Sequence, residues 1–421
     1  MPTITQTATR IVNPPPVLAR SEQRSMYAAL EVTIHTDSSE VRPGRAIVPV
    51  PAATAGLVQA AAGELARRTT GQRLEDVFAA GVWPAVDDSG GYGLAAFKPA
   101  VAAVTDALWD LRATLAGLPL WRLAVGLSPA ELVQGADLRL LSDVLDPAEA
   151  RNLLNNRVPG RAAREGQAER FGYPAAFLQP VPPNTVAGME AVARSAVSQG
   201  FSHVVIELGP RPELALLLCR AAREAGGPDL IIVAQASASW EVDTAIDVGR
   251  ELIEIGPVWL AEPLPAVDAC GLATVRRGCA SSIAVGSPLA IAAGADLTSR
   301  LEAKQLLQAG SVDLLRLDPV SVGGLSEALA VLLLAARFRV PVCPIGRGPG
   351  GALAASRLGL IDFVAIGASL DLRAAELDVA GAGWATAPLT ISEGSCLLGP
   401  PSGPTSQAPA EPSESRIPSR A

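Results

Sequence analysis

The side chains most able to do chemistry lie where short hydrophobic segments end in the second half of the chain. Glu207 ends the segment HVVIE, Gln235 ends LIIVAQ, and Asp318 follows DLLRL. The segment PVWLAEP instead holds Ala261 where a metal site would need a carboxylate. If these segments are parallel strands of one sheet, their carboxyl-terminal ends share one edge, where such folds place their active sites. The sequence therefore predicts the functional site at this edge.

Strand-like apolar runs recur at regular intervals through this half of the chain. They begin near Ser202, Leu230, Pro257, Ile283, Asp313, Val340 and Asp362. The starts lie roughly 22–30 residues apart, which is the length of one strand–loop–helix–loop unit. Short continuous Val/Ile/Leu runs suit parallel strands that are buried on both faces. The pattern predicts an α/β fold with a closed parallel barrel.

Length and charge limit the classes of protein and partner. The chain has 421 residues, a formal net charge of −8 and a sequence pI of about 5.1. No Lys/Arg-rich run could neutralise a phosphate backbone, so we expect no nucleic-acid partner. The N-terminal segment lacks the apolar core of a signal peptide, and the most hydrophobic stretch, 328–336, is too short to span a bilayer. We expect a cytoplasmic protein with no membrane partner.

Cysteines and histidines offer little metal or redox chemistry. The five cysteines are scattered without CxxC spacing, which argues against zinc sites and disulfides. The two histidines are His35, in the N-terminal region, and His203, at the start of a predicted strand. We therefore expect neither a metal nor another cofactor.

Several long motifs resemble the enolase superfamily, and within it most closely L-fuconate dehydratase-type members of the mandelate racemase group. They are the helix TDALWDLRATLAGLPLWRLA, the segment LLSDVLDPAEA, the strand VWLAEP and the run EAKQLLQAGSVDLLRLDPVSVGGLSEALAVLLLAARFRVPVCP. The resemblance implies a modified (β/α)7β TIM-type barrel with an N-terminal α+β capping domain. It also implies abstraction of a proton alpha to a carboxylate, with the enediolate stabilised on Mg²⁺.

Composition and this resemblance together predict the domain boundaries. Residues 1–25 are expected to form a disordered arm, because prolines 14–16 forbid regular structure there. Residues 26–137 form the capping domain and residues 138–375 the barrel. Residues 376–400 are expected to return to the capping domain. The Pro- and Ser-rich residues 401–421 are expected to be a disordered tail.

The acid and base positions of the resembled family are altered in this chain. The Lys-x-Lys pair that ends its second barrel strand corresponds to Val205 and Glu207. The histidine expected after the seventh strand corresponds to Ile345, and its partner aspartate remains as Asp318. Proton transfer from a carbon acid requires a tuned Lys or His near the substrate. The family reaction is therefore expected to be absent.

The metal-binding positions are altered as well. The three carboxylates that end strands three, four and five correspond to Gln235, or Ala234 after a one-residue shift, Ala261 and Ser287. Mg²⁺ needs hard oxygen ligands that usually include carboxylates. Glu262 follows Ala261, but side chains alternate along a strand, so Glu262 is expected to point away from the metal position. We expect no metal at this site.

Three residues are predicted to be catalytic. Along Asp313–Asp318, Leu314, Arg316 and Asp318 share one face, so Arg316 is expected to point into the barrel. A buried guanidinium must be paired. The hypothesis is that Arg316, Asp318 and Glu207 form a polar network in place of the lost charges. The alternatives are that Arg316 turns towards the bottom of the barrel and that Asp318 is bound only by backbone donors.

Five further residues are predicted to bind substrate: Gln235, Ser237, Ser287, Trp240 and Arg347. The serines could equally fill space, since no histidine is near to activate them. Trp240 could belong to the core. Arg347 lies in GRGPGG, a Gly-rich turn that could bind an anion or simply lead into a helix.

These observations leave two functional interpretations. The first is a metal-independent lyase, isomerase or cyclase that acts on a largely apolar small molecule in specialised metabolism. The second is a non-catalytic pseudoenzyme that serves as a ligand sensor or as a partner subunit. The hydrophobic pattern is intact outside the strand ends, which favours a retained role. A small-molecule ligand and a homo-oligomer are expected.

Overall fold

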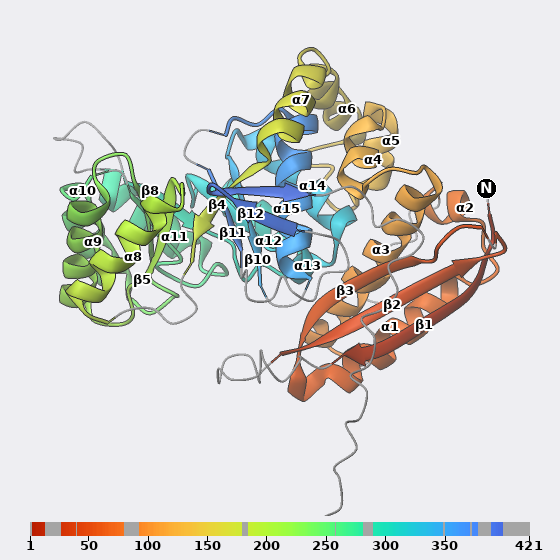
Figure 1. Cartoon of the computed structure of the whole chain (residues 1–421), viewed down its shortest axis with the longest axis horizontal. Coiled ribbons are helices and arrows are strands. Elements are labelled where there is room, and N and C mark those ends of the chain that lie inside the picture. The colour runs from red at the N-terminus through yellow and green to blue at the C-terminus, as the bar shows by residue number, and fades with distance from the viewer. Residues whose placement is uncertain are drawn as a thin grey trace, which may run out of the picture.

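The computed structural model describes residues 2–12, 27–38, 40–79, 92–178, 184–256, 258–280, 289–347, 350–370, 373–377 and 389–398. Over these ranges the chain forms an N-terminal α+β domain and a closed parallel barrel. The sheet of the first domain lies at one end of the molecule, and the outer helices of residues 186–280 lie at the other (Figure 1). The predicted tail, 401–421, and residues 13–25 of the predicted arm lie outside the described residues.

The capping domain is an antiparallel sheet with helices packed on it. Its strands, in the order β1-β2-β3, are β1 (Ile4–Val12), β2 (Tyr27–Thr36) and β3 (Gly44–Pro51). Its helices are η2 (Ala52–Thr54), α1 (Ala55–Thr69), α2 (Leu74–Ala79) and α3 (Leu94–Leu115). The predicted disordered arm is wrong for Ile4–Val12, because this segment pairs with β2 as an edge strand. Its Thr-rich sequence, largely exposed, gives a weak apolar signal.

Eight parallel strands pair in chain order, and the last pairs with the first, which closes the barrel. They are β4 (Tyr173–Phe177), β5 (His203–Glu207), β6 (Ile231–Gln235), β7 (Val258–Ala261), β8 (Ala290–Ala293), β9 (Leu314–Leu317), β10 (Val342–Gly346) and β11 (Ala375–Leu377). The predicted fold class, an α/β TIM-type barrel with an N-terminal α+β capping domain, is confirmed. We call the carboxyl-terminal edge of the eight strands the mouth.

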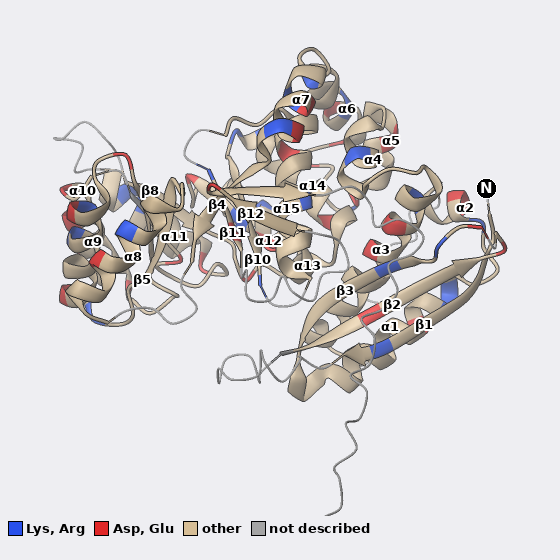
Figure 2. Cartoon of the chain, viewed as in Figure 1, with Lys and Arg blue, Asp and Glu red and all other residues tan. Residues whose placement is uncertain are grey.

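Helices link the two domains and surround the barrel. The linking helices are α4 (Leu120–Gly126), α5 (Pro129–Gly135), α6 (Pro147–Asn155) and α7 (Arg161–Phe171). The barrel helices are α8 (Val186–Ser198), α9 (Pro212–Gly226), α10 (Val242–Ile253), α11 (Ala269–Ala280), α12 (Arg300–Gln308), α13 (Pro319–Val322), α14 (Leu325–Phe338) and α15 (Gly351–Ile361), which continues into the π-helical turn η5 (Asp362–Ile366). Outer helices such as α9 and α10 carry charges of both signs (Figure 2), which is typical of solvent-facing helices.

Two predicted strands are misplaced. The run beginning at Asp362 is the helical turn η5, and the strand expected near Ile283 is instead β8, at Ala290–Ala293. Short apolar runs do not distinguish a strand from a buried helix, and β8, three alanines with Ile291, offers only a weak β-branched signal. Ile283 itself lies outside the described residues.

The C-terminal hairpin packs on the barrel. Its strands are β12 (Leu389–Ser392) and β13 (Ser395–Leu398). The pairs Ser395 with Pro174 and Cys396 with Tyr173 join β13 to β4. The prediction that residues 376–400 return to the capping domain is therefore wrong for the described part, because β11 belongs to the barrel and β13 extends its sheet.

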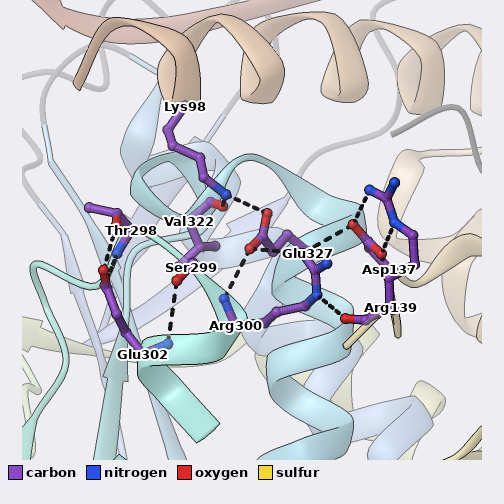
Figure 3. Close-up of polar contacts among 9 residues, drawn as sticks. All are labelled: Lys98, Asp137, Arg139, Thr298, Ser299, Arg300, Glu302, Val322 and Glu327. Carbon is purple, nitrogen blue, oxygen red and sulfur yellow. Dashed lines mark hydrogen bonds and ion pairs between the residues drawn. The ribbon is translucent and has the colours of Figure 1, made fainter. Parts of the chain in front are cut away.

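Helix α3 attaches the capping domain to the start of α14 through buried polar contacts. Lys98 on α3 donates to Glu327 on α14 at 2.8 Å (Figure 3). The same carboxylate accepts from the backbone N–H of Arg300 at 2.9 Å and pairs with its guanidinium at 3.2 Å. Asp137, from the segment between the domains, pairs with Arg300 at 3.1 Å. We call Lys98, Asp137, Arg300 and Glu327 the interdomain ion cluster.

Asp106 on the same helix makes this attachment depend on pH. Its carboxylate accepts from the backbone N–H of Leu325 at 2.8 Å. Burial raises the pKa of Asp106 from 3.8 to about 6, although this N–H and the charge of Arg357 act to lower it and Asp110 acts to raise it. Because the folded-state pKa exceeds the unfolded one, this carboxyl destabilises the fold progressively as pH rises from about 4 to about 6.

We expect Asp106→Asn to remove this dependence, since the amide oxygen can still accept from Leu325. The free energy of unfolding of the variant should match that of the natural chain at about pH 4 and exceed it by up to about 3 kcal/mol at about pH 7. Urea unfolding of the variant and of the natural chain at both pH values measures the difference in their free energies of unfolding. A variant that is less stable at both would contradict the assignment.

None of the described helices is both long enough and apolar enough to cross a bilayer.

Candidate functional site

The wall of the barrel interior is largely apolar, and it surrounds a buried arginine. Its lining includes Val205, Val233, Trp259, Ala261, Ala292 and Leu314. Arg316, two residues after Leu314 on β9, is 1% exposed. The alternation along β9 therefore places the guanidinium inside the barrel, as predicted.

Acidic and amide side chains from three other elements bind this guanidinium. Glu376 on β11 accepts from Nε at 3.1 Å with Oε1 and from Nη2 with Oε2, which makes a bidentate pair. Glu262 accepts from Nη1 at 3.1 Å, and Gln235 accepts from Nη2 at 2.6 Å. We call Arg316, Glu376, Glu262 and Gln235 the barrel ion cluster.

The predicted partners of Arg316 are wrong. Asp318 and Glu207 make their hydrogen bonds elsewhere, whereas Glu262, which was expected to point away, reaches the guanidinium. The reason lies in the backbone: β7 ends at Ala261, and Glu262 has a φ of 47°. That left-handed conformation breaks the alternation of side chains that the prediction assumed.

Burial sets the electrostatics of the barrel ion cluster. Desolvation raises the pKa of Glu262, although the charge of Arg316 and the N–H of Ala295 act to lower it. Desolvation alone would lower the pKa of Arg316, but the carboxylates of Glu376 and Glu262 outweigh it and raise that pKa. The guanidinium is therefore a permanent charge, held by two acids.

A second polar group lies at the end of β5. The Ser237 hydroxyl donates to Glu207 at 2.8 Å, and Gln235 donates to the Ser237 hydroxyl at 3.4 Å. Ser237 reaches this position because its φ of 53° turns the chain sharply after β6. Burial raises the pKa of Glu207, although the Ser237 hydrogen bond acts to lower it. The structure thus brings the predicted residues Glu207, Gln235 and Ser237 together.

Asp318 serves as the cap of helix α13. Its carboxylate accepts from the backbone N–H groups of Val320 at 2.9 Å and Ser321 at 3.4 Å, and from the Ser321 hydroxyl at 3.1 Å. The Asp-Pro sequence at this point is a helix-start signal. Burial raises the pKa of Asp318, although the charge of Arg347 acts to lower it. A structural role accounts for this side chain.

The remaining predicted ligand-binding residues have different surroundings. Arg347 follows β10 and pairs with Asp296, after β8, at 2.7 Å. Trp240 is buried, and its Nε1 has no hydrogen-bond partner among the described residues. Ser287 lies outside the described residues. Because β8 ends at Ala293, the strand-five position falls on the residues that follow it and not on Ser287.

These side chains do not fit a Mg²⁺ site. Strands β6, β7 and β8 end at Gln235, Ala261 and Ala293, and the described residues contain no group of three or more His, Cys, Asp or Glu that could hold a metal ion. The two acids that do converge, Glu262 and Glu376, already bind Arg316. A dication beside this guanidinium would be repelled.

Sequence reasoning missed Glu376. It lies on the three-residue strand β11, after the run at Asp362 that the sequence predicts as the last strand. The signal available was a single acid inside the apolar stretch AAEL, which is unusual for a buried strand.

Comparisons with known proteins agree with this architecture. A family model described as enolase C-terminal domain-like matches residues 179–401. Mitochondrial enolase superfamily member 1 of Xenopus laevis is 30% identical over 83% of this chain and 79% of its own length. L-galactonate dehydratase of Hypocrea jecorina is 29% identical over 65% of this chain and 60% of its own length. The crystal structure of human mitochondrial enolase superfamily member 1 has a TM-score of 0.82 at 27% identity, covering 94% of this chain and 92% of that one.

Proposed function

Because the chain belongs to the enolase superfamily, we propose that it is a homologue that binds and converts an uncharged small molecule at the barrel mouth without a divalent metal ion. The reaction is a lyase, isomerase or cyclase step in specialised metabolism. The ligand has the carbon skeleton of a sugar acid, as the name of the similar L-galactonate dehydratase suggests, but it lacks the free carboxylate.

The balance of charge at the mouth is the observation that carries this proposal. Among the residues that the structure describes there, two cations, Arg316 and Arg347, accompany five acids: Glu207, Glu262, Asp296, Asp318 and Glu376. An incoming carboxylate would meet more acidic than basic side chains, with no dication to offset them. A neutral ligand avoids this repulsion and can donate hydroxyl hydrogens to the acids. We therefore propose a neutral polyhydroxy compound, such as a sugar lactone, in place of the largely apolar ligand expected from the sequence.

Glu207 is the group that we assign to proton transfer. It ends β5, at the position corresponding to the second lysine of the Lys-x-Lys pair, and it is only partly buried. A carboxyl whose pKa is raised by burial is a better general acid or base near neutral pH than an ordinary carboxylate. Ser237 holds its orientation.

The second candidate is a ligand sensor without catalysis. Two of the three predicted catalytic residues, Arg316 and Asp318, make their hydrogen bonds to other groups of the protein. That observation favours a binding role if Glu207 transfers no proton.

A matched ligand pair tests the proposal. We expect L-galactono-1,4-lactone to bind at least about tenfold more tightly than L-galactonate in the presence of EDTA, because only the second carries a carboxylate. Calorimetry measures the affinities for both ligands, and mass spectrometry shows whether a ligand gains or loses water. Glu207→Gln should keep lactone binding and abolish any conversion, whereas the exposed Glu213→Gln should change neither. Preferential binding of L-galactonate that requires Mg²⁺ would overturn the proposal, and lactone binding without conversion would select the sensor.

A further inference from the structure

The barrel ion cluster places a fixed cation where oxygen atoms converge from distant parts of the chain. Gln235, Glu262 and Glu376 lie 81, 54 and 60 residues from Arg316 in sequence, yet all bind its guanidinium. They come from the end of β6, the turn after β7, and β11. The guanidinium thus joins separate sectors of the barrel wall.

Each of the two acids in this cluster is fixed by further contacts. The Glu262 Oε1 atom also accepts from the backbone N–H of Ala295 at 2.8 Å. Its own backbone N–H donates to Ala292 at 2.8 Å, and its carbonyl accepts from Ala238 at 2.7 Å. Glu376 pairs with β10 at Ile345 and with β4 at Ala176. The Glu262 carboxylate and the backbone of Glu376 are therefore held in place by the fold and do not depend on Arg316 alone.

Such an arrangement would be unstable without a cation. Two buried carboxylates that face one another repel, and removing the partner of a buried charge is strongly destabilising. A dication with oxygen ligands could supply the compensating charge, because carboxylate and amide oxygens are the donors that Mg²⁺ and Mn²⁺ prefer. In this chain the compensating charge is instead part of the chain itself.

We propose that Arg316 is a built-in cation that replaces a divalent metal ion as the counter-charge of Glu262 and Glu376, and that removing it turns the same oxygen atoms into a divalent-cation site. This inference rests on one claim of the proposed function, that the mouth binds no divalent metal ion. It does not rest on the identity of the ligand. Arg316 is a positioning residue, since its hydrogen bonds hold Glu262, Glu376 and Gln235 around one point.

The variant Arg316→Met, which retains an apolar stem of similar length, tests this proposal. In EDTA it should melt below the natural chain, and Mn²⁺ should restore at least half of the loss. Electron paramagnetic resonance should show Mn²⁺ bound at one site per chain. The natural chain and Arg316→Lys, which keeps the cation, should show no bound Mn²⁺ and no metal-dependent melting.

Further variants make every outcome decisive. Adding Glu376→Gln to Arg316→Met should weaken Mn²⁺ binding at least tenfold. If Arg316→Met folds only in Mn²⁺, the proposal holds. If Arg316→Met folds without binding Mn²⁺, the proposal is wrong. If it folds neither in EDTA nor in Mn²⁺, the proposal is also wrong. This holds whether or not the uncharged variant Arg316→Met/Glu262→Gln/Glu376→Gln folds. Mn²⁺ binding by the natural chain that Glu376→Gln abolishes would overturn the metal-free function itself.

Discussion

Glu327→Ala is expected to lower the free energy of unfolding by about 3–5 kcal/mol, because it leaves two buried cations without their shared partner. Glu327 binds Lys98 through Oε2 at 2.8 Å and Arg300 through Oε1 at 3.2 Å, and all three side chains are less than one tenth exposed. Lys98 belongs to the capping domain, so the substitution should also loosen the attachment of α3 to α14.

Urea unfolding measures the stability of this variant, and tryptophan fluorescence reports the interface directly. Trp109 on α3 donates to the Ser326 hydroxyl, beside Glu327, at 2.9 Å. Its emission should therefore change at lower urea in Glu327→Ala than in the natural chain. The exposed Glu251→Ala on α10 provides a control and should cost less than about 0.5 kcal/mol. Equal stability of the two variants would show that the interdomain ion cluster contributes no net stability.

The barrel could be predicted from sequence where its strands carry β-branched side chains. Segments such as HVVIE and IIVAQ have this signal, and they form β5 and β6 as expected. The strand β8 has one β-branched residue, Ile291, and the three-residue strand β11 has none, so both depend on pairing with neighbours far along the chain. Local propensity contains no information about such pairing.

The candidate site could be predicted only in part, for a related reason. Alternation along β9 is a local property, and it placed Arg316 inside the barrel correctly. The partners of Arg316 depend on a left-handed residue after β7 and on the position of β11, neither of which leaves a pattern in the neighbouring residues. Glu262 and Glu376 therefore became visible only once the barrel was closed.

Arg373→Met is expected to destabilise the opposite, amino-terminal end of the barrel by about 3–5 kcal/mol at about pH 8. Arg373 donates to Asp362 at 2.7 Å and to the carbonyl of Val342, the first residue of β10, at 3.3 Å. The side chains of Arg373 and Asp362 are 2% and 4% exposed. Burial raises the pKa of Asp362, and Arg373 is the group that lowers it. Without Arg373 a buried carboxylate has no counter-charge.

The loss in this variant should shrink as pH falls. Because burial raises the folded-state pKa of Asp362, and this pKa rises further without Arg373, the carboxyl takes up a proton at higher pH than an ordinary aspartate does, and the unpaired charge then disappears. Unfolding at about pH 5 should therefore show a smaller difference from the natural chain than at about pH 8. The double variant Arg373→Met/Asp362→Asn, which has no charge to lose, should recover most of the stability at both pH values. A loss that is independent of pH and persists in the double variant would assign the effect to packing around Arg373 instead of to its charge.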